Sequence, residues 1–457
     1  MQAYANLQAL LERSQWWSKE QLLDHQFRQL TPLLRHAATT VPLYRRKFQE
    51  AGLDAALITP ENWRSLPFLT RSDLQESILL SSSLPMGHGI LSVTQTSGAT
   101  GQPVSIHSTN ITGLFWLAIT RRDHHWHRRD LTRKLAIIRY NPDLAMPPEG
   151  LTYANWGIAA APPLNRGVAV LHSVRTPIDR QLEWLALHNP DYFLTYPSNL
   201  AALIAGSREL GLTFANLREV RTISETLSPE LRTVCREAWG VEITDTYSSQ
   251  EVGYIALQCP VHPHFHVQAE SVLVEVLNDR GNPCQPGEIG RIVITALHNY
   301  ATPLIRYEIR DYAEVGPPCP CGRGLPVLTR VMGRQRNMLV LPTGEKCWPI
   351  TGYPHYKEVA PIRQFQFIQH SLTEVEMKVV CDRVLSGSDK ERLTEIIREG
   401  LGYPFTVRFT PTDRIPQGPN GKFEEFVSLV AQPPESQGND LSHRARTFSQ
   451  VMEHDQQ

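Results

Sequence analysis

The most informative stretch of this 457-residue chain is Thr96-Ser97-Gly98-Ala99-Thr100-Gly101-Gln102-Pro103. Glycines let the backbone approach an anion closely, and hydroxyl and amide groups donate hydrogen bonds to phosphate oxygens. No Gly-Lys-Ser/Thr follows, so the stretch is not a Walker loop. Taken alone, a segment of this kind is more often an ordinary turn than a phosphate site. The rest of the chain therefore has to decide between the two interpretations.

Short β-branched runs alternate with helical patterns from about residue 91 to residue 299. This alternation predicts an α/β domain with mostly parallel strands, followed by a smaller β module. The expected strands of the domain are 134–138, 167–171 and 192–195, its helices 197–206 and 229–239, and the module strands 271–277 and 290–296.

The two ends of the chain differ from this middle part. Residues 21–38 have leucines at helical spacing, and a turn and a second helix follow from Val41. After about residue 336 the pattern restarts as a compact α+β unit, with strands at 362–370 and 374–381 and a helix at 388–400. We therefore expect a large domain over 1–335, a small domain over 336–432 and a polar, disordered tail over 433–457.

The composition excludes several classes of protein. A net charge of −1 argues against nucleic acid and anionic membranes as partners, because these demand a basic face. No apolar run is long enough to span a bilayer, and the polar N-terminus does not resemble a secretory signal. Seven cysteines, an odd number, do not suggest a disulfide framework, so a cytoplasmic location is expected.

Several segments together resemble the adenylate-forming superfamily of acyl-CoA synthetases, and within it the phenylacetate-CoA ligase family. They are the loop quoted above, Val41-Pro42-Leu43-Tyr44-Arg45-Arg46-Lys47-Phe48 and Leu66-Pro67-Phe68-Leu69-Thr70-Arg71-Ser72-Asp73-Leu74. The resemblance covers residues 18–427 and implies a large N-terminal adenylation domain with a smaller, mobile C-terminal lid. It implies ATP- and magnesium-dependent activation of a carboxylic acid, in particular an aryl acid, to an acyl-adenylate, which is then passed to a thiol such as that of coenzyme A.

The resemblance assigns nucleotide-binding roles to five segments. In the loop at 96–103, Gln102 stands where the family usually has lysine. In a separate segment, Arg310 stands directly before Asp311, at a position where the family usually has glycine. By resemblance Tyr247 stacks on adenine, Glu251 binds magnesium and Asp311 accepts from the ribose hydroxyls. The ATP- or AMP-binding set implied is Thr96, Ser97, Gly98, Thr100, Gly101, Ser224, Glu225, Thr246, Tyr247, Ser248, Asp311 and Arg334.

The resemblance also assigns a hinge and a catalytic lysine. Gly333-Arg334-Gln335-Arg336-Asn337 resembles the junction at which the small domain pivots, with Arg336 at the hinge. Lys422, in a Pro/Gly-rich turn, would bridge the substrate carboxylate and the α-phosphate. A cation there offsets the repulsion between two anions that must react. Catalysis is thus assigned to Lys422 and Glu251.

Cysteines and histidines form a second group. Thiolates and imidazoles suit a tetrahedral zinc ion, and some phenylacetate-CoA ligase relatives carry a similar arrangement as a structural site. The preferred quartet is Cys259, His266, Cys319 and Cys321, with the histidine, among His262, His264 and His266, the least certain member. Free cysteines beside a histidine-rich surface loop are the alternative.

The acid and the acceptor are weakly encoded. By analogy the acid pocket is lined by Tyr153, Trp156, Gly157 and Tyr196, although core packing explains each residue equally well. Coenzyme A is the favoured acceptor, with a carrier protein or an amine as the alternative, and a homodimer stays open. A protein of another class, a non-catalytic nucleotide-binding homologue, is the third interpretation.

Overall fold

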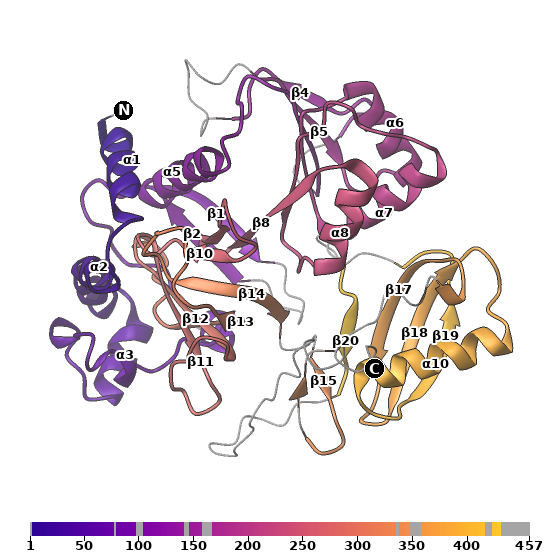
Figure 1. Ribbon diagram of the computed structural model, residues 1–457. Coiled ribbons are helices and arrows are strands. Elements are labelled where there is room, and N and C mark those ends of the chain that lie inside the picture. The colour runs from indigo at the N-terminus through magenta and orange to yellow at the C-terminus, as the bar shows by residue number, and fades with distance from the viewer. Residues whose placement is uncertain are drawn as a thin grey trace. The chain divides into compact units, whose positions relative to one another are not determined.

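The computed structural model describes residues 2–76, 79–96, 104–140, 146–157, 167–334, 338–344, 346–347, 349, 356, 358–415 and 423–430. The chain forms two compact units; the main boundary falls between Met332 and Gly333, and the turn Asn278–Asn282 is grouped with the second unit. Figure 1 labels their elements. The expected tail, 433–457, lies outside the described residues.

The helices of the larger unit have clear sequence signals at their ends. Ser18 caps α2 through a capping box with Gln21, and Ser228 and Gly240 bracket α8 as N-cap and left-handed C-cap. The bounds are α1 Gln2–Ser14, α2 Lys19–Thr40, α3 Pro42–Glu50, the 3₁₀ turns η1 Ala55–Leu57 and η2 Trp63–Ser65, α4 Arg71–Glu76, α5 Asn110–Trp126, α6 Ile178–His188, α7 Pro197–Glu209 and α8 Pro229–Trp239.

A large mixed sheet is the centre of this unit. Among the described residues it has twelve strands, in the order β11-β12-β13-β14-β10-β9-β8-β7-β6-β3-β5-β4. The strand bounds are β3 Leu135–Arg139, β4 Leu151–Tyr153, β5 Ala169–Ser173, β6 Tyr192–Thr195, β7 Glu219–Ile223, β8 Glu242–Ser249, β9 Gly253–Gln258, β10 Phe265–Val267, β11 Val272–Leu277, β12 Ile289–Ala296, β13 Tyr307–Val315 and β14 Val327–Arg334.

One half of the sheet is parallel. β5 and β6 flank β3, and β7 and β8 follow in parallel register, so the carboxyl ends of these strands share one edge. Helices α6, α7 and α8 pack on these strands through a common apolar core (Figure 1). Ligands of open α/β sheets bind at such an edge, which is why this edge is the place to look for a site.

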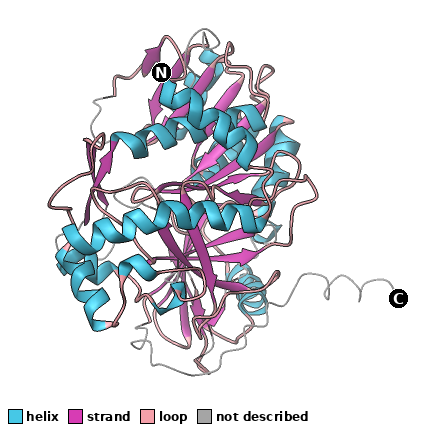
Figure 2. Cartoon of the chain, turned by 90° about the vertical axis from the view of Figure 1, so that its left-hand side faces the viewer, coloured by secondary structure: helices cyan, strands magenta, loops and turns pink. Residues whose placement is uncertain are grey.

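The other half is antiparallel and is covered by the N-terminal helices. Leucines of α2 and aromatic residues of α3 share a core with β11, β12 and β13. Figure 2 shows long helices (cyan) lying across strands (magenta) in this region. A separate hairpin, β1 Ile90–Thr96 with β2 Val104–Thr109, flanks the predicted phosphate loop.

A buried ion-pair network joins α5 to the parallel strands. Asp123 accepts from Arg221 at 2.7 Å and also pairs with Arg129, which in turn forms two hydrogen bonds with Glu219. Burial alone would raise the pKa of Asp123, but the two arginines outweigh it and hold the pKa well below its usual range. The carboxylate is therefore charged and structural.

The smaller unit contains, among its described residues, a four-stranded sheet, the short pair β15–β16 and the long helix α10. The four-stranded sheet has the order β19-β18-β17-β20, and α10 covers it through leucine and isoleucine side chains. The bounds are β15 Leu339–Val340, β16 Lys346–Cys347, β17 Ile362–Gln369, β18 Glu374–Cys381, α10 Gly387–Leu401, β19 Thr406–Pro411 and β20 Phe426–Ser428.

The predicted fold class is confirmed, with two differences in detail. The expected elements 192–195, 229–239 and 374–381 have the predicted bounds, and most others shift by one to three residues. The sheet is less parallel than expected, because the strands after β8 run antiparallel. Helix α1 was not singled out from the sequence.

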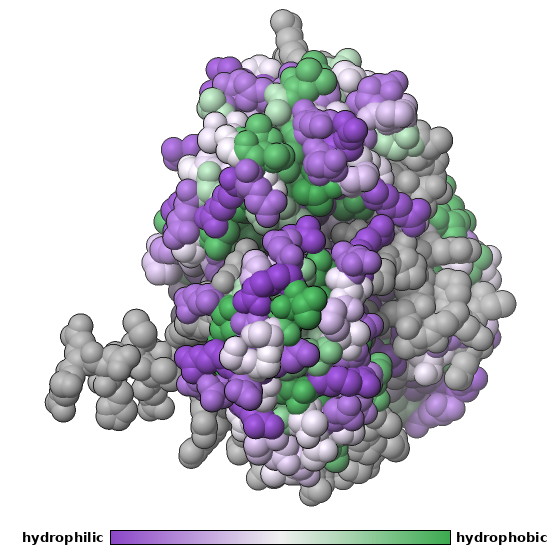
Figure 3. All heavy atoms as spheres, turned by 90° about the vertical axis from the view of Figure 1, so that its right-hand side faces the viewer, coloured by the Kyte–Doolittle hydropathy of each residue, from purple (hydrophilic) through white to green (hydrophobic). Residues whose placement is uncertain are grey.

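The described part of the chain has no helix long and apolar enough to cross a membrane. Hydrophilic and hydrophobic residues are interspersed on the face drawn in Figure 3.

Candidate functional site

Two predicted nucleotide residues meet at the end of the parallel half. Tyr247 lies near the carboxyl end of β8 and Asp311 lies in the middle of β13. The Tyr247 hydroxyl donates a hydrogen bond of 2.8 Å to Oδ2 of Asp311, across 64 residues of sequence. The fold thus brings an aromatic ring and a carboxylate side by side, which suits a purine face and a ribose diol.

Glu251 lies in the turn between β8 and β9, four residues after Tyr247. Its side chain is only 10% exposed, and the nearest guanidinium nitrogen, of Arg71, is 4.0 Å from its Oε1. A carboxylate in this position is chemically suited to a hard cation such as magnesium. Thr246 is buried in β8, directly before Tyr247, and Ser248 pairs with Tyr254 of β9.

Asp245, two residues before Tyr247, was not singled out from the sequence. It accepts a 2.7 Å hydrogen bond from Oγ1 of Thr222, and burial raises the pKa of its carboxyl to about 6. The strand that carries Tyr247 therefore carries a titratable group in its buried part.

Ser224 and Glu225 follow β7 at the same edge. The Glu225 carboxylate accepts from the backbone N–H and the hydroxyl of Ser198, at 2.9 and 3.0 Å, and so fixes the first turn of α7. Ser224 has a φ of 72°, in the left-handed region that favours glycine. This segment therefore keeps a tight, glycine-like turn although it contains no glycine.

Arg310 has the same property next to Asp311. Its φ is 67°, again in the left-handed region. The backbone thus retains the conformation of the glycine that the resemblance led us to expect, and an exposed arginine carries the strain. Arg334, the last residue of β14, is exposed.

Several predicted residues lie outside the described part of the chain. They include most of the phosphate loop, the hinge and the catalytic lysine, namely Ser97, Gly98, Thr100, Gly101, Gln102, Arg336, Asn337 and Lys422. Of Thr96, only the backbone is described, at the end of β1.

The structure separates the four predicted acid-pocket residues. Tyr196 follows β6 at the carboxyl edge, and its hydroxyl accepts from the backbone N–H of Tyr140 at 3.1 Å. Tyr153 pairs with Ala169 at the amino end of β5, and the Trp156 indole donates to the Arg133 carbonyl just before β3. Tyr153, Trp156 and the neighbouring Gly157 thus lie at the edge opposite to Tyr196.

Tyr140 is a second pocket candidate that sequence reasoning missed. It follows β3 directly, at the same edge as Tyr196, and the guanidinium of Arg175 lies 4.6 Å from its ring centroid. A search of the sequence for aromatic residues directly after the predicted parallel strands would have found Tyr140.

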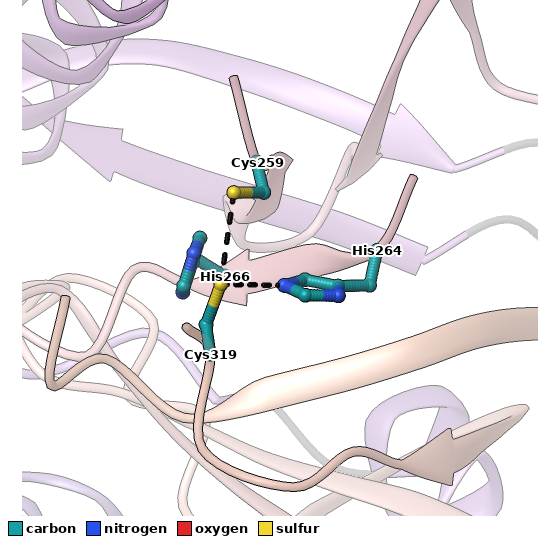
Figure 4. Close-up of side chains that lie close together, drawn as sticks. All are labelled: Cys259, His264, His266 and Cys319. Atoms are coloured by element: carbon teal, nitrogen blue, oxygen red, sulfur yellow. Dashed lines mark hydrogen bonds between the residues drawn. The ribbon is translucent and has the colours of Figure 1, made fainter. Parts of the chain in front are cut away.

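The cysteine and histidine cluster has formed (Figure 4). The ligand atoms of Cys259, His264, His266 and Cys319 all lie within 4.8 Å of one another. His264 thus takes the place that the sequence analysis gave to Cys321, although Sγ of Cys321 is still 3.4 Å from Nε2 of His266.

The geometry of this cluster fits a tetrahedral metal. Sγ of Cys259 and Sγ of Cys319 are 3.8 Å apart, the edge expected for two Zn–S bonds of about 2.3 Å. Burial lowers the pKa of His266 to about 4, so its imidazole is neutral and able to bind a metal. Burial raises the pKa of the Cys319 thiol well above its ordinary value without a metal.

Comparisons with known proteins agree with this picture. The CapK C-terminal domain family matches residues 348–428. Phenylacetate-coenzyme A ligase of Thermus thermophilus is 23% identical over 90% of this chain and 97% of its own length. The Escherichia coli protein of the same name is 26% identical over 71% of this chain and 74% of its own.

A solved structure has a similar fold over most of its length. It is 2-hydroxyisobutyryl-CoA ligase in the postadenylation state in complex with R3-HIB-AMP. It aligns with a TM-score of 0.73 and 19% identity over 91% of each chain. The resemblance stated from the sequence is thereby confirmed: the chain is related to the phenylacetate-CoA ligases and has the fold of the adenylate-forming CoA ligases.

Proposed function

We propose that this protein is an AMP-forming acid–thiol ligase that activates an aryl acid with ATP and transfers the acyl group to coenzyme A. The observation that carries the proposal is the hydrogen bond between Tyr247 and Asp311. Two motifs far apart in sequence, each assigned to the nucleotide by resemblance, lie in direct contact. Relatives named as coenzyme A ligases over most of the chain give further support.

The side chains divide the first step between them. Tyr247 would hold the adenine face, Asp311 would accept from the two ribose hydroxyls, and Glu251 would hold magnesium. When bound, magnesium offsets charge on the triphosphate. The substrate carboxylate attacks the α-phosphorus and pyrophosphate departs toward the loop at 96–103. By the resemblance, Lys422 would bridge the substrate carboxylate and the α-phosphate in this step and offset their repulsion.

The second step transfers the acyl group. The thiolate of coenzyme A attacks the carbonyl carbon of the mixed anhydride, and AMP leaves with the former carboxylate oxygen. By the resemblance, the small domain would pivot at Arg336 between the two steps, remove Lys422 and admit the thiol. The substrate side is assigned to Tyr196 and Tyr140, at the edge that also carries Tyr247. A cytoplasmic location stays a prediction.

We also propose a structural zinc ion at the cysteine and histidine cluster. Cys259, Cys319 and His266 would be three ligands, and His264 or Cys321 the fourth. The support is the donor set and the tetrahedral sulfur–sulfur distance. The ion would tie the β9–β10 connection to the segment before β14 and take no part in the chemistry.

Acid-dependent exchange of pyrophosphate into ATP tests the function. We expect exchange with at least one member of an aryl acid panel, and a loss of about 100-fold or more in Lys422→Ala. Lys390→Ala, on the exposed side of α10, is the matched control and should keep full exchange. If no acid supports exchange while ATP still binds, the protein is a non-catalytic nucleotide-binding homologue instead.

A further inference from the structure

Arg71 lies beside the carboxylate assigned to magnesium. Its Nη1 is 4.0 Å from Oε1 of Glu251, and the two side chains are 13% and 10% exposed. The guanidinium is also a hydrogen-bond partner of the Tyr307 hydroxyl at the start of β13. A largely buried cation therefore lies next to the carboxylate to which the proposed function assigns magnesium.

The backbone holds this arginine in a fixed position. Leu69 forms a parallel bridge with Tyr307, through hydrogen bonds with Arg306 and Glu308 of 3.0 and 2.9 Å. This isolated bridge lies two residues before the start of α4.

The first turn of α4 is fixed as well. The Thr70 N–H and hydroxyl donate to Asp73 at 2.8 and 2.9 Å, and Lys47 pairs with Asp73 at 3.1 Å. Arg71, the next residue after Thr70, therefore loses little backbone freedom when its guanidinium binds a ligand.

Two other buried arginines of this chain are paired more closely with carboxylates. Arg129 makes two hydrogen bonds of 2.8 and 2.7 Å to Glu219, and Arg306 makes two of 3.0 Å to Glu275. The 4.0 Å separation of Arg71 and Glu251 is too long for a hydrogen bond. The pair is thus close enough for charge attraction, but the carboxylate is not locked in a bidentate contact.

The sequence gives a reason for a cation at this point. The segment 96–103 contains no lysine or arginine, so its own side chains cannot neutralise phosphate charge. A guanidinium is well suited to that task, because its planar fork matches two phosphate oxygens.

We propose that Arg71 binds the β- and γ-phosphates of ATP at the metal site of Glu251. This inference rests on the proposed function, because it needs magnesium ATP at that site. AMP lacks both phosphates, so its binding does not depend on Arg71. The residue thereby acts on ATP capture and on departing pyrophosphate, and not on the adenosine part.

The test measures binding of magnesium ATP and of AMP by calorimetry, without acid, to the full chain. Arg71→Gln should weaken magnesium ATP about 10- to 100-fold, the range for a lost charge-assisted contact, and change AMP affinity less than about threefold. Arg291→Gln is the control, since Arg291 is 17% exposed and pairs with Glu308 at 3.4 Å. It should bind both nucleotides as the unchanged protein does.

The outcomes separate this inference from the proposed function. Magnesium ATP affinity in Arg71→Gln within about threefold of the unchanged protein overturns it. An equal loss of ATP and AMP affinity also overturns it, because that indicates a structural role. If Arg71→Gln does not fold, Arg71→Lys is tested instead. Lysine keeps the positive charge but lacks the planar guanidinium that binds two phosphate oxygens, so the affinity for magnesium ATP should fall at least about threefold while the affinity for AMP stays the same. An unchanged protein that binds neither nucleotide sinks the proposed function itself.

Discussion

Replacing Arg310 by glycine is expected to stabilise the larger unit by about 0.5–1 kcal/mol. The arginine has a φ of 67°, and a left-handed backbone costs a residue with a Cβ about 1–2 kcal/mol. Glycine removes that cost but gives up about 0.5–1 kcal/mol through the greater freedom of the unfolded chain. The strain is the larger of the two terms, so the net change favours the folded state.

Urea unfolding followed by tryptophan fluorescence measures this change. Eight of the nine tryptophans precede Met332, so the signal reports mainly on the larger unit. The matched control is Arg330→Gly, at an exposed arginine of β14 without a positive φ. The same substitution there should destabilise by about 0.5–1 kcal/mol. Equal destabilisation by both substitutions would refute the strain argument.

Three further predictions follow from buried groups. Asp123→Asn should lower the free energy of unfolding of the larger unit by about 3–5 kcal/mol, measured by urea unfolding, because Arg129 and Arg221 lose their buried counter-ion. Since the pKa of Asp123 is lowered, its contribution to stability is present above the unfolded pKa of about 4 and is lost in acid. A variant as stable as the unchanged protein at pH 7 would contradict the account. The pKa of Asp245 is raised to about 6, so the unchanged protein loses the stability of the neutral carboxyl as the pH rises through that value. Asp245→Asn does not titrate and should therefore gain up to about 3 kcal/mol in free energy of unfolding, relative to the unchanged protein, between pH 4 and pH 7.5. A difference between the two proteins that does not depend on pH would argue against this. Metal analysis should find about one zinc per chain, which is lost in Cys319→Ser but kept in the control Cys284→Ser. Comparing the zinc content of Cys321→Ser and His264→Asn identifies the fourth ligand. Protein purified without chelator that contains no zinc would contradict the proposed site.

The sequence predicts the parallel half of the sheet well because its signals are local. Ser228, Pro229 and Gly240 mark the ends of α8, and the run 192–195 is apolar between turn residues. The antiparallel half was harder to predict at β10 and β14, because Phe265 of β10 pairs with Leu328 of β14, which comes much later in the chain. Nothing within a short window specifies such a partner.

Site residues could be predicted where their type and the order of their motifs identify them. They were harder to predict where the choice between residues depends on distances in the folded chain. Tyr247 and Asp311 were named from their motifs, and only the fold brings them into contact. The choice between His264 and Cys321 depends on distances of a few ångströms within one cluster. Tyr153 and Trp156 were expected beside Tyr196, but strand direction puts them at the opposite edge.

One measurement tests adenylate formation most directly. The enzyme is given ATP, coenzyme A and an active acid whose carboxylate carries heavy oxygen, and the AMP is analysed by mass spectrometry. The account predicts one labelled oxygen in the phosphate of AMP, because the anhydride breaks at the acyl carbon. Label in inorganic phosphate alongside ADP, or unlabelled AMP, would contradict it.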